Sequence, residues 1–376
     1  MEDKSRMSSR VLVTGGAGFI GCHVARALLQ RGYEVRVLDS LIDQVHTRGA
    51  VRDGVLNHVE MIRADVRDLD RVSAALDGVD NVIHLAAEVG VGQSMYAIDR
   101  YVSVNDHGTA VLFQALIDRP VGRVVVASSM SVYGEGLYRT SSGARIDDAV
   151  RPAHRLASGW DPVGPDGGAL TPVPTPESKP PNFASVYALT KYVQERLTLT
   201  VAPAYGMQGV ALRLFNVYGP GQALSNPYTG VLAIFASRLL NRERPLVFED
   251  GAQRRDFIHV EDIARAFILA LEHPDAPGHV FNIASGRDVS IAEVGAALAD
   301  AMRVPHLTPE VMGKARVGDI RHCFADIQLA QKVLGFEPRR SFEDSLGELA
   351  EWVRQQQAED RVQDARRELE QRGLVA

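Results

Sequence analysis

The sequence predicts an α/β protein with a doubly wound parallel sheet and a smaller C-terminal α/β lobe. Apolar runs of strand length alternate with segments that show helical spacing of apolar residues, which is typical of parallel strands covered by helices. The first strand leads into a glycine-rich turn, VTGGAGFIG. Small and polar residues follow the later strands as well. We therefore expect the chemistry at the carboxyl edge of the sheet.

The glycine-rich turn lies between a strand over 11–13 and a helix that is under way by residue 24. Backbone N–H groups and the positive end of the helix dipole meet in such a turn and suit a pyrophosphate. Gly15 suits a tight turn, Gly18 a close approach of the phosphates, and Gly21 close packing of helix on strand. The turn thus predicts a dinucleotide site of the Rossmann type.

The second strand, over 34–38, ends on Asp39, roughly 20 residues beyond the glycine turn. A carboxylate there can bind both hydroxyls of an adenosine ribose and repels a 2′-phosphate, so NAD is favoured over NADP. A third strand over 58–63 leads to Asp65. That residue could bind an adenine amino group, or it is a loop aspartate.

The next elements are a short helix over 72–76, a buried strand over 81–85 and a helix over 94–116. Ala86 and Ala87, directly after the buried strand, leave room for the nicotinamide ribose. A fifth strand follows over 123–127, a helix capped by Ser185 over 185–202, and a sixth strand over 209–214.

Residues 134–182 interrupt the alternation of strands and helices, because they are rich in Gly, Pro, Ser and Asp. A loop of that length is usually a functional flap or an ordered excursion, and we expect an insertion beside the active site. From about residue 221 the pattern loosens into short helices and strands. The expected division is a disordered leader (1–10), an NAD-binding domain (11–220, with insertion 135–182), a substrate lobe that is not strictly contiguous (221–346) and a charged C-terminal helix without chemistry (347–376).

Tyr187 and Lys191 lie four residues apart on the helix over 185–202, so their side chains share one face. A tyrosine of pKa about 10 is a poor base at neutral pH. A neighbouring ammonium and a bound nicotinamide cation both stabilise the phenolate and should lower that pKa. Ser129, at the end of the fifth strand, could bind the sugar oxygen whose proton Tyr187 removes.

Composition excludes several other classes of protein. The net charge of -6 with mixed signs argues against nucleic-acid binding, and no run of about 18 apolar residues suggests a membrane span. The first ten residues lack the apolar core of a secretory signal. Cys22 and Cys323 are the two cysteines and show no metal-ligand spacing, so we expect a cytoplasmic protein without disulfides or metal.

Eight short motifs, taken together, resemble the extended short-chain dehydrogenase/reductase superfamily in its nucleotide-sugar epimerase and dehydratase branch. The resemblance covers residues 11 to about 346. The motifs are TGGAGFIG (14–21), DVRD (65–68), HLAA (84–87), SSMSVYG (128–134), YALTK (187–191), RLFNVYGP (213–220), RDFIHV (255–260) and RVGD (316–319).

The resemblance implies a role for each matching residue. Ser129, Tyr187 and Lys191 would be catalytic. The residues implied to contact NAD are Gly15, Gly18, Phe19, Ile20, Gly21, Asp39, Asp65, Val66, Leu85, Ala86, Ala87, Asn105, Ala127, Tyr187, Lys191 and Phe215. The residues implied to bind the nucleotide sugar are Val89, Ser129, Met130, Asn216, Val231, Arg255, Arg316, Asp319 and Cys323. Among these, the two arginines and Asp319 would hold the diphosphate and nucleoside, and guanidinium groups can bind phosphate oxygens bidentately.

Departures from the family pattern indicate which reaction is catalysed. Dehydratases of the family that this chain resembles carry an acidic pair directly after the catalytic hydroxyl residue. Decarboxylating members of the family keep a Glu there. Here those positions are Met130 and Ser131. The remaining reaction is oxidation and re-reduction at C4, which is 4-epimerisation through a 4-keto sugar.

The segment 88–96, the SSMSVYG stretch and the long insertion most resemble bacterial dTDP-L-rhamnose 4-epimerases and their neighbours. Cys323 stands where such epimerases set the size of the sugar pocket, and its small side chain leaves UDP-N-acetylhexosamine, UDP-glucose or UDP-glucuronate open. A keto-sugar reductase or dehydrogenase and a non-catalytic nucleotide-binding protein are the alternative functions. The resemblance also implies a homodimer that pairs the helices over 101–116 and 187–202.

Overall fold

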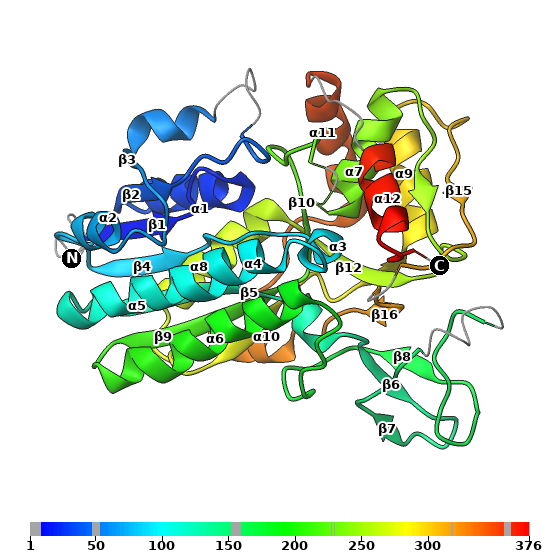
Figure 1. Cartoon of the computed structure of the whole chain (residues 1–376), viewed down its shortest axis with the longest axis horizontal. Helices are drawn as coiled ribbons and strands as arrows, with labels where there is room; N and C mark the ends of the chain where they lie inside the picture. The colour runs from blue at the N-terminus through cyan, green and yellow to red at the C-terminus, as the bar shows by residue number, and fades with distance from the viewer. Residues whose placement is uncertain are drawn as a thin grey trace.

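The computed structural model describes residues 9–46, 53–151, 159–226, 228, 230–316, 319–356 and 362–375. Its centre is a seven-stranded sheet in the order β13–β9–β5–β4–β1–β2–β3, and every pair in it is parallel (Figure 1). The strands are β1 (Arg10–Thr14), β2 (Glu34–Asp39), β3 (Glu60–Arg63), β4 (Asn81–His84), β5 (Arg123–Ser129), β9 (Gln208–Leu214) and β13 (Val280–Ile283). Strand order reverses between β1 and β4, which confirms the predicted doubly wound sheet.

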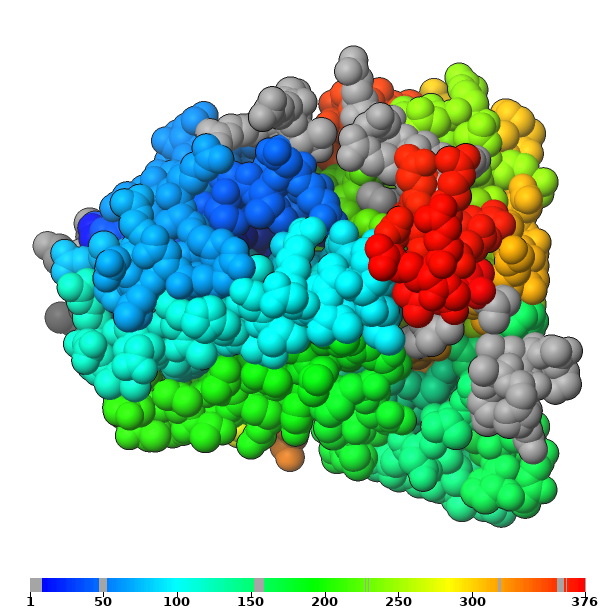
Figure 2. Space-filling view, viewed as in Figure 1, coloured from blue at the N-terminus to red at the C-terminus, as the bar shows by residue number. Residues whose placement is uncertain are grey.

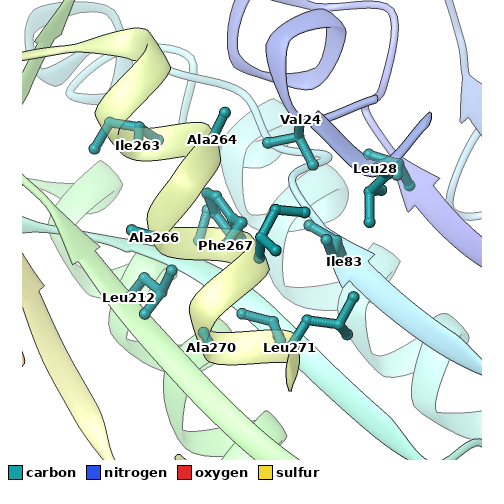
Figure 3. Packing of buried hydrophobic residues seen from close by; sticks show 14 of the residues in the cluster. Val24, Leu28, Ile83, Leu212, Ile263, Ala264, Ala266, Phe267, Ala270 and Leu271 are labelled. Atoms are coloured by element: carbon teal, nitrogen blue, oxygen red, sulfur yellow. The ribbon is translucent and has the colours of Figure 1, made fainter. Parts of the chain in front are cut away.

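Helices cover both faces of this sheet. One face carries α1 (Phe19–Gln30), α8 (Val260–Glu272) and α10 (Gln328–Leu334). The other carries α2 (Leu69–Ala75), α5 (Gly108–Asp118) and α6 (Val186–Ala204). Figure 3 shows the first of these two cores, where Phe267 of α8 lies among Val24 and Ile83. Burial on both faces explains why the strands read as nearly continuous apolar runs.

The single helix predicted over 94–116 is wrong in detail. The chain there forms α3 (Val91–Ser94), α4 (Ile98–Tyr101), a π-helix η3 (Val102–His107) and then α5. Asn105 lies within the π-helix and is fully buried, with hydrogen bonds to Glu88 and Thr190. A π-turn adds a residue to one helical turn, and here it accompanies the inward placement of this amide.

The smaller lobe contains β10 (Asn216–Tyr218), β12 (Arg254–His259), β14 (Asp288–Ser290), β16 (His322–Cys323), β11 (Leu246–Val247), β15 (Glu310–Val311), α7 (Val231–Leu240), α9 (Ile291–Ala301) and α11 (Phe342–Arg354). It has its own hydrophobic core between α7, α9 and α11. Three elements within the predicted lobe range, α8, β13 and α10, belong instead to the main sheet and its cover. All three belong to the main domain in space although they follow the lobe's first elements in sequence.

The insertion forms a small antiparallel sheet rather than an unstructured loop. Its strands are β6 (Leu137–Arg139), β7 (Arg145–Ile146) and β8 (Thr171–Val173), with β6 in the middle. Figure 1 shows this sheet projecting beside the lobe, away from the helices of the main domain. The insertion is therefore an ordered excursion of the chain.

The range 347–376, predicted as one charged helix, contains the end of α11 and a separate helix, α12 (Val362–Gln371). The apolar side of α11 is buried in the lobe core through Leu346, Leu349 and Val353, and α12 lies at the cavity described below. Residues 1–8 of the predicted leader lie outside the described residues, whereas Arg10 already belongs to β1 and pairs with Glu34.

Within the described part of the chain, no helix is both long and apolar enough to cross a membrane. In the same residues, no group of three or more His, Cys, Asp or Glu side chains is arranged to hold a metal ion.

Candidate active site

A cavity of about 990 Å³ opens along the carboxyl edge of the main sheet, between that sheet and the smaller lobe. It is lined by nearly all the residues that the sequence singled out. These are Gly15, Gly18, Phe19, Ile20, Gly21, Asp39, Asp65, Val66, Leu85, Ala86, Ala87, Val89, Ala127, Ser129, Met130, Tyr187, Lys191, Phe215, Asn216, Val231, Arg255, Arg316 and Asp319. The topology thus brings the ends of several strands and the lobe to one site.

The glycine turn is shaped by contacts that leave no room for side chains. Gly15 has a positive φ of 68°, and a Cβ there would lie 2.7 Å from the backbone nitrogen of Ala86. A Cβ on Gly21 would lie 2.5 Å from the Cα of Gly16, so α1 packs directly on the turn. Gly18 is the N-cap of α1 and provides no side-chain hydrogen bond. The first N–H groups of α1 are therefore open to an anion in the cavity, which fits the pyrophosphate of a dinucleotide.

Asp39 at the end of β2 is 8% exposed and lies close to this turn. Its carboxylate accepts hydrogen bonds from the backbone N–H groups of Ala17, at 3.1 Å, and Leu41, at 2.8 Å. These donors hold the carboxylate at the cavity wall, where a ribose could reach it. Asp65, predicted to meet the adenine, also lines the cavity, but Arg67 pairs with it at 2.6 Å.

Tyr187, Lys191 and Ser129 come together from α6 and the end of β5. Burial raises the pKa of Tyr187, and the nearby hydroxyl of Ser129 acts in the opposite direction. Lys191 is not among the groups that lower this pKa, and its Nζ donates to Gln194 Oε1 at 2.7 Å. Burial also lowers the pKa of Lys191 to about 7.

A buried polar chain joins Lys191 to the strand ends, and the sequence reading missed it. Gln194 Nε2 contacts Thr109 Oγ1 at 2.9 Å and the ring of His84 at 3.1 Å. The other ring nitrogen of His84 is hydrogen-bonded to Thr14 Oγ1 at 2.7 Å. Burial lowers the pKa of His84 to about 3, so its ring is neutral. The signal available in the sequence was the position of Gln194, one helical turn beyond Lys191.

Two predicted site residues do not line the cavity. Asn105 binds the backbone of Glu88 and the hydroxyl of Thr190, so it supports the cavity wall from behind. Cys323 is 1% exposed in a cluster with Met130 and Phe215. Cys323 therefore packs in the interior, although β16 pairs with β12, whose Arg255 lines the cavity.

Charged side chains line the end of the cavity that lies away from the glycine turn. Arg316 pairs with Asp319 at 3.0 Å, and Arg255 is held by the backbone carbonyls of Arg254 and Arg321. Burial opposes ionisation of Asp319, but Arg316 and Arg255 outweigh it and hold the pKa of its carboxyl below the usual range. Asn216 Oδ1 is buried and has no hydrogen-bond partner among the described residues. A ligand with polar groups would satisfy that atom.

A doubly wound sheet with this glycine turn, this acidic strand end and this Ser-Tyr-Lys group defines a dinucleotide-dependent enzyme of the short-chain dehydrogenase/reductase class. The chain belongs to the NAD dependent epimerase/dehydratase family, whose sequence profile matches residues 11–153 and 162–284. The cofactor is therefore NAD.

Three known proteins illustrate the likeness. A dTDP-L-rhamnose 4-epimerase of Burkholderia thailandensis is 36% identical over 355 residues, which covers 92% of this chain and 95% of that protein. The structure of a UDP-N-acetylglucosamine 4-epimerase of Methanobrevibacter ruminantium in complex with UDP-N-acetylmuramic acid superposes with a TM-score of 0.74 at 31% identity, covering 92% of this chain and 98% of that one. The structure of a UDP-glucose 4-epimerase of Thermus thermophilus in complex with NAD has a TM-score of 0.73 at 30% identity, covering 92% and 99%. Together they support nucleotide-sugar 4-epimerisation.

Proposed function

We propose that this chain is a nucleotide-sugar 4-epimerase whose substrate is a dTDP-6-deoxyhexose such as dTDP-L-rhamnose. The observation that carries the proposal is the Ser129–Tyr187–Lys191 group beside Met130 and Ser131 on the same cavity wall. Neither of those two side chains can transfer the extra proton that elimination of water requires. The Burkholderia relative, at 36% identity, supports the choice of sugar.

In the proposed reaction Ser129 binds the oxygen of the sugar 4-hydroxyl and Tyr187 accepts its proton. NAD supplies the hydride acceptor for C4 and later returns that hydride. The sugar is then a 4-keto compound, and it must turn so that its other face meets the cofactor. Tyr187 returns the proton to the same oxygen. Substrate and product therefore differ only in the configuration at C4, and no outside reductant is consumed.

We assign the two ends of the cavity to the two ligands. The glycine turn with Phe19, Ile20 and Asp39 would hold the pyrophosphate and adenosine of NAD, and Leu85 to Ala87 its nicotinamide ribose. Arg255, Arg316 and Asp319 would hold the diphosphate and nucleoside of the substrate, and Asn216 would use its unsatisfied oxygen on the substrate. The sugar would lie between these ends, against Ser129 and Tyr187.

A homodimer is part of this proposal. Ile98 and Val102 precede α5, and Leu189 lies on α6; these large apolar side chains are 51%, 40% and 44% exposed. All three lie in or beside the helices that the family resemblance pairs across a two-fold axis. Large exposed apolar side chains on these helices favour a protein interface.

The deciding experiment is proton NMR of the purified protein with a panel of nucleotide sugars and no added cofactor. The panel contains dTDP-L-rhamnose, UDP-glucose, UDP-N-acetylglucosamine and UDP-glucuronate. Conversion of dTDP-L-rhamnose until both C4 epimers coexist supports the proposal. Conversion of another sugar would change the substrate but keep the epimerase, whereas stoichiometric NADH formation without epimerisation would indicate a dehydrogenase.

A further inference from the structure

The C-terminal helix α12 lies over the mouth of the cavity rather than on a hydrophobic core. Its residues Val362, Ala365, Arg366 and Leu369 all line the cavity, and their spacing places them on one helical face. Ala365 and Leu369 are 8% and 7% exposed. Among the described residues, neither belongs to any of the hydrophobic clusters that pack the two domains. The apolar face of α12 is therefore buried toward the cavity.

On one side α12 contacts the segment that leads to the reaction centre. The two terminal methyl groups of Leu369 lie 3.5 Å from where a Cβ on Gly92 would be. Arg372 stacks over the ring of Tyr96, 4.4 Å from its centroid. A Cβ on Gly90 of the same segment would lie 3.1 Å from the Tyr101 hydroxyl, and the Tyr101 ring meets the ring of Tyr187 edge-on at 6.5 Å. The segment that Leu369 contacts therefore leads, through Tyr101, to the catalytic tyrosine.

On the other side the end of the chain contacts the charged part of the cavity. Val375 forms an antiparallel bridge with Arg316, which we assign to the substrate diphosphate. Lys314 pairs with Glu370 at 3.3 Å. Figure 2 shows α12, in red, between the cyan segment around α3 and the yellow-orange segment of the lobe. The helix therefore spans the two halves of the molecule across the site.

Glu370 is shared by two cations at this face, Arg366 and Lys314, so it compensates one of their two positive charges. Arg366 is the one cation that α12 turns to the cavity among the lining residues, and its Nε pairs with Glu370 at 2.9 Å. The rest of the face is aliphatic. The aliphatic part of this wall stabilises an apolar substituent of a bound sugar.

We propose that α12 forms the wall of the sugar site and that Leu369 is a specificity-determining residue that contacts the hexose. This proposal rests on the proposed function, and it extends it by assigning the discrimination of an apolar C5 substituent to the C-terminal helix. A 6-deoxyhexose presents a methyl group to Leu369, where a uronic acid would present a charged carboxylate.

The test compares wild type with Leu369→Ser and with Arg367→Ser as the matched control. Arg367 is on the same helix but its side chain is 69% exposed and does not line the cavity. Calorimetry measures the affinity of each protein for dTDP and for dTDP-L-rhamnose, and NMR measures kcat/KM. A third variant ends at Gln356 and removes α12 without removing any residue of the two domain cores.

We expect Leu369→Ser to weaken binding of dTDP-L-rhamnose, and to lower kcat/KM for it, by about tenfold, because one apolar contact is worth roughly that factor. Its affinity for dTDP should stay within about twofold of wild type, and Arg367→Ser should match wild type for both ligands. The shortened chain should lose at least as much affinity for the sugar nucleotide as Leu369→Ser.

The proposal is overturned if Leu369→Ser binds dTDP-L-rhamnose as tightly as wild type does. It is also overturned if binding of dTDP and of dTDP-L-rhamnose falls equally, because α12 would then act through Arg316 and not on the sugar. Failure of the proposed function has a different signature, since wild type would bind the sugar nucleotide without epimerising it. The binding comparison still decides the role of Leu369 in that case.

Discussion

Arg151 Nη2 donates a hydrogen bond to the backbone oxygen of Asp319 at 2.5 Å. Arg151 belongs to the insertion, and Asp319 lies in the part of the lobe that we assign to the substrate nucleotide. The same guanidinium pairs with Glu249 at 2.6 Å and with Glu135 at 3.0 Å, and all three side chains are buried. The insertion therefore fixes the lobe from behind the charged end of the cavity.

Replacing Arg151 by Gln should lower the free energy of unfolding by about 3 kcal/mol, because it removes one cation that pairs with two buried carboxylates. It should also weaken binding of dTDP about tenfold, since the backbone of Asp319 loses its anchor. Chemical denaturation and calorimetry measure the two effects. The control is Arg145→Gln in the same insertion, whose ion pair with Asp147 is on the surface and should matter little. Equal effects of the two changes would contradict this role for Arg151.

Tyr187→Phe should reduce kcat for epimerisation by roughly 10²- to 10⁴-fold, the usual worth of a positioned acid–base group. Binding of NAD and of the sugar nucleotide should change little, because the ring still fills its place beside Tyr101. Tyr192→Phe on the same helix is the control, since that ring packs against Phe183 and does not line the cavity. If Tyr187→Phe kept most of the wild-type rate, catalysis by this residue would be refuted, and unchanged biological output would favour a non-catalytic protein.

The pKa of Lys191, lowered by burial to about 7, predicts a pH dependence of stability in protein stripped of NAD. Between pH 7 and the unfolded pKa of about 10.4, the unfolded chain binds more protons at this lysine than the folded chain does. The free energy of unfolding should therefore rise with pH in that window. Relative to Lys191→Met, the gain should be about 4 kcal/mol across it, measured by denaturation at each pH. Parallel pH profiles of the two proteins would show that Lys191 is not buried as an ionisable group.

Asp39→Asn should weaken NAD binding about tenfold, because a charged acceptor for the two ribose hydroxyls becomes neutral. The same change removes repulsion of a 2′-phosphate, so the ratio of NAD to NADP affinity should fall further. Titration of cofactor-free protein with both nucleotides measures that ratio. Asp43→Asn is a demanding control, because Asp43 lines the same cavity and has no assigned role at the ribose. If both changes lowered the ratio alike, general charge in the cavity, and not Asp39, would set the preference.

The proposed dimer predicts that a double change, Val102→Glu with Leu189→Lys, produces a monomer at micromolar concentration. Analytical ultracentrifugation of wild type should show a dimer, because large exposed apolar side chains on these helices favour self-association. Leu69→Glu is the control, since that side chain is 43% exposed on α2, outside the predicted interface. A monomeric wild-type protein would contradict the predicted assembly.

Local patterns in the sequence were sufficient for six of the seven strands of the main sheet and for most of the cavity. A strand that ends at Thr14, a glycine turn and a helix are adjacent in the chain, so their geometry follows from residues that are neighbours. The same holds for Tyr187 and Lys191, because a helix fixes the relation of residues four apart. Because parallel strands end at one edge, Asp39 and Ser129 could also be expected at a common site.

Only the tertiary structure decided which distant segments complete that site. The contact of Gln194 with His84 requires α6 to pack on the end of β4. Cys323 was expected at the sugar pocket from the family resemblance, but it is buried in a cluster with Met130 and Phe215.

The C-terminal helix α12 shows most clearly what the sequence determines and what only the tertiary structure decides. The sequence by itself determined that α12 is charged and amphipathic, because this depends on the order of its residues alone. It could not determine what its apolar face covers, because burial depends on surfaces that other segments provide. Leu369 meets Gly92 and Val375 meets Arg316 only once the sheet, the lobe and the chain end have packed together.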